Sequence, residues 1–273
     1  MTSFTSNGIA CDREGPRGEL PLVLIHAGVA DRGMWDPVWP ELISDRDVVR
    51  VDLRGFGDSA ARPAGAVSHP ADVLGTLSEI GVDRCHVVGA SFGAGVATEV
   101  ALTRPSAVAS LVLAAPGGSL LAEVTPDLRA FFEAEGAALE RGDLDAAVEA
   151  NLSCWVEGTR RSADQVESSV REHVRRMQRR AFEVTADWDD VEEQELDPPA
   201  LDRLSEITVP VLVLVGGFDL DTVHDAARRV TAGIAGARRV DWPDAGHLPS
   251  LESPAAFTDL LREWLKSVSA VAS

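Results

Sequence analysis

The sequence predicts an α/β fold, in which helices flank both faces of a mostly parallel β-sheet. Short apolar runs of strand length alternate with longer helical patterns along most of the chain. Most of these runs are continuously apolar rather than alternating, as expected for strands that helices cover on both faces. A chain of 273 residues that is 45% hydrophobic can also bury the substantial core that this architecture needs.

The elements of this core can be placed from the apolar runs and from the turn and capping residues between them. Asn7-Gly8 predicts a turn between two very short leading strands. Asp221 and Thr222 can cap one helix, and Ser253-Pro254 can begin the last one. The longer strands are expected at residues 22–26, 48–53, 86–89, 111–114, 211–216 and 239–242, and the helices at residues 71–80, 92–103, 221–234 and 253–268.

A long segment without a strand pattern interrupts this alternation. Charged helical patterns cover residues 127–141, 144–156 and 163–182. We therefore expect a core domain made of residues 1–118 and 200–273, with a helical cap of residues 119–199 inserted between strands 6 and 7. The last of these helices carries a basic run that we expect to be a solvated face paired with nearby acids: Arg171, Arg175, Arg176, Arg179 and Arg180.

The stretch from residue 87 to residue 95 reads Val-Val-Gly-Ala-Ser-Phe-Gly-Ala-Gly, which is a strand, a Gly-x-Ser-x-Gly turn and the start of a helix. Such a turn holds Ser91 in a strained backbone geometry and exposes its hydroxyl above the sheet. Gly89 and Gly93 fit because side chains there would collide. An ordinary glycine-rich turn is the alternative. A phosphate-binding loop is disfavoured, because neither Gly-x-Gly-x-x-Gly nor Gly-Lys-Ser/Thr is present.

Residues 52–59 supply a second motif, Asp-Leu-Arg-Gly-Phe-Gly-Asp-Ser. Together with the serine turn, it makes the chain resemble the α/β-hydrolase superfamily, and within it the compact esterase- and lactonase-like enzymes with a helical cap. The resemblance covers nearly the whole chain outside the insert and implies the α/β-hydrolase fold. We expect the 52–59 loop to be structural, with glycines for a tight turn and charges for internal hydrogen bonds.

The resemblance also implies a catalytic triad in the order Ser, Asp or Glu, His. Ser91 would be the nucleophile and His247, in a Gly-His loop after the last expected strand, would be its base. Asp219 follows the strand at 211–216 and would be the acid. Asp221 is the rival, which we interpret as the first residue of a helix. Among the other histidines, we expect His86 in the core and His69, His173 and His224 at the surface.

The loop after the first long strand reads His26-Ala27-Gly28-Val29 and resembles the His-Gly-x segment of the family. The resemblance implies that the backbone amides of Gly28 and Phe92 form an oxyanion hole. Ala27 stands where the family usually has glycine, which leaves Val29 as an alternative donor to Gly28. Trp155, on an expected cap helix, either lines the substrate pocket or packs the cap onto the core.

The expected function is hydrolysis of a carboxylic ester or lactone of small-molecule size, with no metal or organic cofactor. The same triad could instead serve carbon–carbon bond hydrolysis, perhydrolysis, or a lyase or cyclisation step in a biosynthetic pathway. A ligand-binding protein that kept the fold without turnover is the alternative from another class.

Charge and composition exclude several other classes of function. A formal net charge of −19 disfavours binding to nucleic acids or to anionic membrane surfaces. No apolar run approaches the roughly 20 residues of a membrane span, and the N-terminus lacks the core of a signal peptide. The three cysteines show no disulfide or zinc pattern. We therefore expect a cytoplasmic protein that is a monomer or a homodimer.

Overall fold

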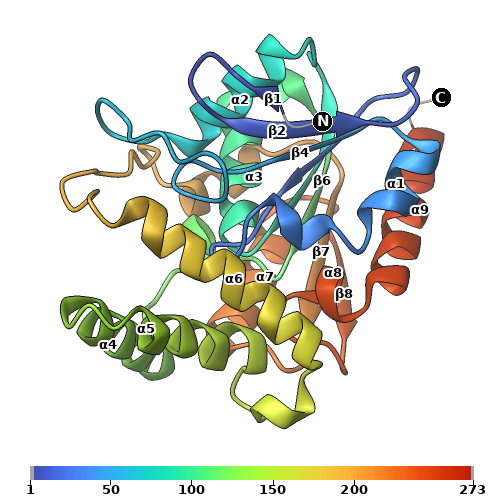
Figure 1. Ribbon diagram of the computed structural model, residues 1–273. Helices are drawn as coiled ribbons and strands as arrows, with labels where there is room; N and C mark the ends of the chain where they lie inside the picture. The colour runs from blue at the N-terminus through green and yellow to red at the C-terminus, as the bar shows by residue number, and fades with distance from the viewer. Residues whose placement is uncertain (1–2, 272–273) are drawn as a thin grey trace.

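The computed structural model describes residues 3–271, with side chains through residue 269, and it is built around one twisted β-sheet (Figure 1). The eight strands follow the order β1-β2-β4-β3-β5-β6-β7-β8. The β1–β2 and β2–β4 pairs are antiparallel and all other pairs are parallel. The strands are β1 Ser3–Phe4, β2 Ala10–Glu14, β3 Leu22–Ile25, β4 Val48–Val51, β5 Cys85–Ala90, β6 Val108–Ala114, β7 Val211–Gly216 and β8 Arg238–Trp242.

The apolar strands bury both of their faces, as the continuous runs predict. In β3, Val23 and Ile25 belong to one core cluster, whereas Leu22 and Leu24 belong to the other. This separation follows from the two-residue period of a strand. The first cluster is covered by α2 His69–Glu79, α3 Phe92–Thr103 and α7 Asp221–Gly233, and the second by α1 Trp39–Asp45, α8 Pro249–Glu252 and α9 Pro254–Val271. Figure 1 shows α1 and α9 side by side at one edge.

Helices fill the connection between β6 and β7 and lie beyond the carboxyl ends of the strands (Figure 1). The apolar face of α6 contributes Val174 and Met177 to the second core cluster. The division into core and cap domains stays a prediction. The elements of this connection are η3 Gly118–Leu120, α4 Pro126–Glu140, α5 Leu144–Asn151, the π-helix η4 Leu152–Glu157, the 3-10 turn η5 Ala163–Gln165, α6 Ser168–Thr185 and η6 Ala200–Glu206.

Three details differ from the sequence prediction. The helix expected at 144–156 is α-helical only to Asn151 and continues as the π-helix η4. The helix expected from residue 163 begins at Ser168, because a capping box closes η5 and Val166 is extended. The structure also adds η1 Arg32–Trp35 and α1, where prolines at 37 and 40 hide the helical period.

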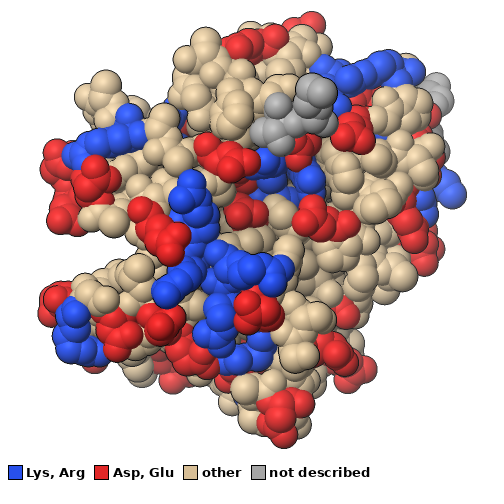
Figure 2. Space-filling view, in the orientation of Figure 1, with Lys and Arg blue, Asp and Glu red and all other residues tan. Residues whose placement is uncertain are grey.

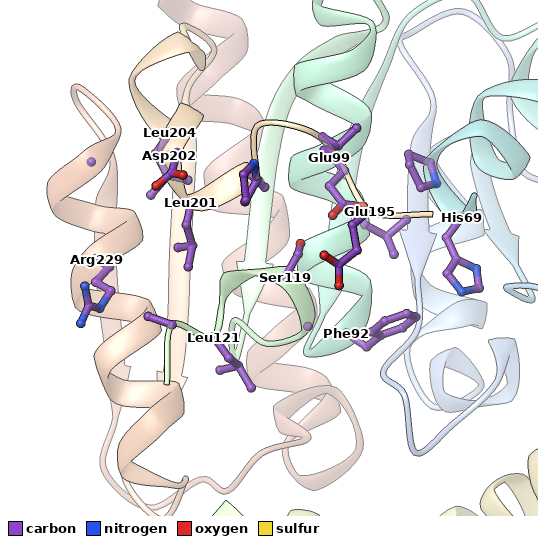
Figure 3. Close-up of a pocket in the computed structure, with 18 of the residues that line it drawn as sticks. His69, Phe92, Glu99, Ser119, Leu121, Glu195, Leu201, Asp202, Leu204 and Arg229 are labelled. Atoms are coloured by element: carbon purple, nitrogen blue, oxygen red, sulfur yellow. The ribbon is translucent and has the colours of Figure 1, made fainter. Parts of the chain in front are cut away.

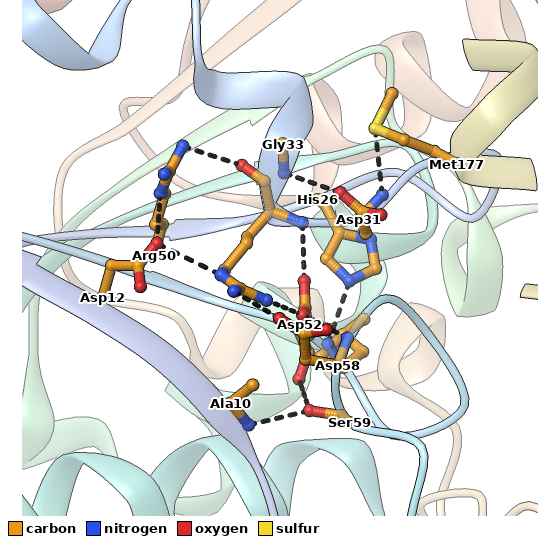
Figure 4. A network of polar contacts seen from close by, with 12 residues as sticks. Ala10, Asp12, His26, Asp31, Gly33, Arg50, Asp52, Asp58, Ser59 and Met177 are labelled. Carbon is orange, nitrogen blue, oxygen red and sulfur yellow. Dashed lines mark hydrogen bonds and ion pairs between the residues drawn. The ribbon is translucent and has the colours of Figure 1, made fainter. Parts of the chain in front are cut away.

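The 52–59 loop is tied together by buried polar contacts (Figure 4). Asp52 accepts the backbone N–H groups of Arg32 at 2.7 Å and Asp58 at 2.8 Å, and it forms an ion pair with the Arg32 guanidinium. Ser59 Oγ donates to the Asp52 carbonyl at 2.8 Å and accepts the Ala10 N–H at 2.9 Å. These contacts agree with the structural role expected for the loop.

The same loop fixes the ring of His26, the residue directly after β3. His26 Nε2 accepts the Leu53 N–H at 2.9 Å, so Nδ1 carries the proton and donates to the Ala27 carbonyl at 2.8 Å. Burial lowers the pKa of His26 to about 3, and the ring is therefore neutral at pH 7. Two directional hydrogen bonds thus anchor the backbone just before Gly28.

Charged side chains cover much of the surface in both signs (Figure 2). Arginines of α6 lie in the middle of this view, and several are paired with acids, as expected. Arg171 lies 2.5 Å from Glu149 and 2.7 Å from Glu157, and Arg179 lies 3.2 Å from Asp145. Within residues 3–271, no helix combines the length and the apolar character that a membrane crossing requires.

Replacing Ser59 with alanine should lower the free energy of unfolding by about 1–3 kcal/mol, because the Ala10 N–H and the Asp52 carbonyl would lose a buried partner. Urea unfolding monitored by circular dichroism measures the change. Ser44→Ala is the matched control, since this hydroxyl bonds Glu41 at the exposed surface. Equal stability of the two variants would contradict the structural role of Ser59.

Candidate functional site

The turn between β5 and α3 holds Ser91 in a conformation that non-glycine residues rarely adopt. Its backbone angles are φ 51° and ψ −117°. A Cβ on Gly89 would lie 2.2 Å from the Gly93 carbonyl oxygen, and a Cβ on Gly93 would lie 2.4 Å from the His26 carbonyl oxygen. Only glycine allows α3 to approach the sheet so closely, and this approach forces the sharp turn at Ser91.

Three loops bring Ser91, His247 and Asp219 together. His247 Nε2 lies 2.7 Å from Ser91 Oγ. On the other side of the ring, His247 Nδ1 lies 2.8 Å and 3.0 Å from the two carboxylate oxygens of Asp219. With the Nδ1 proton directed at Asp219, Nε2 is free to accept the Ser91 hydroxyl proton. These side chains form one continuous chain of hydrogen bonds.

Burial strengthens the contact between Asp219 and His247. The two residues keep only 2% and 3% of their accessible surface, so the interaction acts in a medium that screens charge weakly. Asp219 Oδ1 also accepts the Leu220 N–H at 2.9 Å. The rival acid Asp221 is exposed at the first position of α7, where the sequence prediction put it.

The two amides expected in the oxyanion hole belong to adjacent backbone segments. A Cβ on Gly28 would lie 3.3 Å from the Phe92 Cβ, so the loop after β3 passes directly beside the start of α3. Among the described residues, neither the Gly28 N–H nor the Phe92 N–H donates a hydrogen bond. Both amides therefore remain without an acceptor inside the described part of the chain, as the expected oxyanion hole requires.

Gly117 and Gly118 were not singled out as site residues from the sequence. A Cβ on Gly117 would lie 3.0 Å from Ser91 Oγ, and Gly118 has a φ of 60° beside Phe92. These glycines let the loop after β6 pass over the serine without covering it. The Gly-Gly pair marks a break between elements, but nothing local to it indicates contact with the site.

Trp155 of η4 lies over the site. Its ring centroid is 4.8 Å from that of His247, and Phe131 of α4 meets it edge to face at 5.6 Å. Trp155 also packs against both core clusters. The two roles that the sequence left open, lining the site and packing the helices onto the core, are therefore combined in one side chain.

An ion pair that sequence reasoning missed holds the loops of Asp219 and His247. Arg161 bonds the Glu252 carboxylate at 2.5 Å and the Val156 carbonyl at 2.7 Å. Glu252 in turn accepts the Gly246 N–H at 3.1 Å and 3.2 Å, next to His247. The Arg161 guanidinium also lies 5.1 Å from the centre of the Phe218 ring, next to Asp219. The 91-residue separation of the pair leaves no local sequence signal.

The expectation of a surface position was wrong for His69. This residue is 5% exposed, and its ring meets Phe92 edge to face at 5.2 Å. The burial arises from long-range pairing, because Val67 forms a parallel bridge with Glu193. His86 is buried, as expected, and its Nδ1 lies 2.8 Å from Ser110 Oγ.

Within the described part of the chain, no group of three His, Cys, Asp or Glu side chains is arranged to hold a metal ion. Two of the acids near residue 220 instead have separate partners. Asp219 bonds His247, and Asp225 pairs with Arg228 on the surface of α7.

Comparison with known proteins places the chain in a family. Residues 22–260 match the model of the alpha/beta hydrolase family. A Variovorax paradoxus (strain S110) protein, provisionally named a carbamate hydrolase, is 29% identical over 268 residues, covering 91% of this chain and 92% of the relative.

Two solved structures are similar in both fold and sequence. An esterase from Thermogutta terrifontis has a TM-score of 0.74 at 26% identity, covering 98% of this chain and 97% of its own. Est816, described as an N-acyl homoserine lactone degrading enzyme, has a TM-score of 0.72 at 26% identity, covering 93% of this chain and 96% of its own. With the family model matched over most of the sequence, the chain belongs to the alpha/beta hydrolase family.

Proposed function

We propose that the protein is a serine hydrolase that cleaves carboxylic ester or lactone bonds of a small-molecule substrate. The observation that carries the proposal is the hydrogen-bond chain from Ser91 through His247 to Asp219. Esterase and lactone-degrading structures among the similar proteins support the same bond type.

In the first half of the proposed reaction, Ser91 Oγ attacks the carbonyl carbon while His247 Nε2 takes its proton. Asp219 keeps the imidazole in the tautomer that can accept this proton and stabilises the imidazolium that forms. His247 then returns the proton to the leaving alkoxide, and an acyl-serine ester remains. For a lactone, the released hydroxyl stays attached to the acyl group.

In the second half, a water molecule attacks the acyl-serine ester and gives its proton to His247. This attack forms a tetrahedral intermediate. Its collapse releases the carboxylic acid, and the proton on His247 restores the Ser91 hydroxyl. The Gly28 and Phe92 amides are proposed to hold the negatively charged oxygen in both steps. Such a donor is typically worth roughly 3–4 kcal/mol of transition-state stabilisation.

The wall above the site favours an apolar acyl or alcohol group. Trp155 and Phe131 present aromatic surface near His247. Gly28 adds no side chain of its own to the loop that passes Phe92. We therefore propose that substrate selectivity depends on the helical connection between β6 and β7, which supplies both aromatic residues.

Replacing Ser91 with alanine should lower kcat for p-nitrophenyl acetate by roughly 10⁴- to 10⁶-fold, because no other hydroxyl replaces the nucleophile. Initial rates at saturating substrate measure the loss. Ser44→Ala should keep the wild-type rate, since this exposed serine lies on α1. Turnover by Ser91→Ala at the wild-type rate would remove the proposed function.

Breaking the Arg161–Glu252 pair should lower kcat by roughly 10- to 100-fold with a smaller change in KM, because the His247 loop would lose its alignment. Arg161→Met and Glu252→Gln each remove the ion pair. If the pair acts as a unit, the double variant should be no slower than the slower single variant.

The control is Arg160→Met, because Arg160 is the exposed neighbour of Arg161. Rates should be normalised by titrating the reactive serine, so that a loss of folded protein is not counted as a loss of kcat. Wild-type kcat per titrated site in Arg161→Met would show that the pair only supports folding.

A further inference from the structure

A cavity of about 1060 Å³ lies along α3, outside the group formed by Ser91, His247 and Asp219. Its walls come from α3, α7, the start of α2, residues 118–122 and the returning segment 193–205. Phe92 and Gly118 line it and contact each other, since a Cβ on Gly118 would lie 3.1 Å from the Phe92 ring, whereas Ser91 is not among the lining residues. Figure 3 shows His69 and Phe92 at one end and Arg229 at the other.

The α3 wall contains a buried carboxylate. Phe92, Val96 and Glu99 follow the helical spacing that puts them on one face, and all three line the cavity. Glu99 is only 9% exposed, and within residues 3–269 no Lys, Arg or His forms an ion pair with it. A buried charge without a cation is unfavourable, and burial correspondingly raises the pKa of Glu99.

Two more carboxylates lie close to Glu99. Glu193 and Glu195 come from the segment that Val67 holds in place, through hydrogen bonds of 2.8 Å to Glu192 and 2.7 Å from Gln194. Figure 3 shows the Glu99 and Glu195 carboxylates directed into the same space, close to Ser119. The charges of Glu193 and Glu195 act on Glu99 in the direction that raises its pKa. The arrangement thus places three carboxylates at this end of the cavity beside one ionisable partner among the described residues, His69, which lies 3.5 Å from Glu193 and acts on Glu99 in the direction that lowers its pKa.

Two buried polar atoms beside this charge have no hydrogen bond of ordinary geometry to any described residue. They are Ser119 Oγ and His69 Nδ1. Hydrogen bonding by the Ser119 hydroxyl lowers the pKa of Glu99, so Ser119 is already directed at that carboxylate. His69 is 5% exposed, and its other ring nitrogen lies 3.5 Å from Glu193. Buried polar groups in folded proteins are nearly always satisfied, so the Nδ1 atom of His69, which lines the cavity, indicates a ligand that completes it.

The lining determines which ligand chemistry fits. Four carboxylates disfavour an anion, and the described acids and histidines form no group of three arranged to hold a metal ion. Part of the wall is apolar, so the ligand should carry hydrocarbon as well as charge. The apolar lining residues are Val96, Leu121, Leu196, Leu201 and Leu204.

We propose that this cavity binds a small organic ammonium ion, with the ammonium group between Glu99 and Glu195 and the apolar body against Leu121 and Leu201. An ammonium group has three N–H donors, enough for both carboxylates and the Ser119 hydroxyl. The proposal concerns a site separate from Ser91 and holds whether or not the ester-cleaving function is correct.

Calorimetric titration of the whole protein with phenethylammonium tests the proposal. We expect saturable binding with one ligand per chain, weakened by added salt as charge pairing requires. The isosteric probes 2-phenylethanol and phenylacetate should bind at least tenfold more weakly, because they lack the cation. The measurement involves no turnover, so its outcome is independent of the Ser91→Ala result.

Glu99→Gln should weaken phenethylammonium binding at least tenfold, since it removes the charge with little change in shape. In the absence of ligand, the same variant should have a higher midpoint of thermal unfolding than the wild type. Removing a buried charge that has no ion pair should stabilise the folded protein. Replacing a carboxylate that only supports the fold should not raise the unfolding midpoint. Glu263→Gln, at an exposed position of α9, is the matched control and should change neither quantity.

Glu195→Gln provides a second test on an exposed side chain, in case Glu99→Gln does not fold. The proposal is overturned if wild-type protein binds neither phenethylammonium nor hexylammonium saturably at low salt. Equal binding of 2-phenylethanol would also overturn it. The proposal is also overturned if a folded Glu99→Gln variant binds phenethylammonium as tightly as the wild type. If Glu99→Gln does not fold, the same result for Glu195→Gln overturns it.

Discussion

The close approach of α3 to the sheet is the constraint on which the rest of the site depends. Gly89 and Gly93 sit where any Cβ would overlap backbone atoms, so the chain can pass from β5 into the helix only through a sharp turn. That turn imposes a positive φ on Ser91 and lifts its hydroxyl above the strand ends. It also places the first free amide of α3 beside the loop after β3. One packing contact therefore sets the position of both the hydroxyl and the amide.

The remaining groups are held by interactions formed when the protein folds. Two hydrogen bonds fix the neutral ring of His26 and so hold the backbone that leads to Gly28. On the opposite side, the Arg161 guanidinium contacts the segments carrying Asp219 and His247. Charged and polar groups that are already oriented need not reorganise during a reaction, which is how buried dipoles stabilise developing charge. The two networks share no residue, so the loops on the two sides of Ser91 are held independently.

Local patterns were sufficient for the sheet, and the family resemblance named the residues that meet at the turn. Continuous apolar runs locate the parallel strands, and because the carboxyl ends of those strands share an edge, residues that follow β5, β7 and β8 must lie near one another. Asp219 and His247 were named from the family resemblance, and this shared edge is consistent with that choice. The burial of His69 could not be predicted, since it depends on a bridge between residues 67 and 193. The π-helical turn that carries Trp155 and the Arg161–Glu252 pair likewise depend on tertiary contacts that no short window of sequence contains.

Helix α3 links the two regions of interest. Its small residues Ala94, Ala97 and Ala101 belong to the core, whereas Phe92, Val96 and Glu99 face the cavity. Glu99 is a buried carboxylate with no ion pair to a described residue, on a helix whose other buried residues are mostly apolar. Such local conflicts in a stable fold concentrate at functional sites. Phe92 belongs to both regions, with its amide beside Ser91 and its ring against the cavity. A single residue at the start of α3 therefore contributes backbone to the turn at Ser91 and side chain to the wall of the cavity.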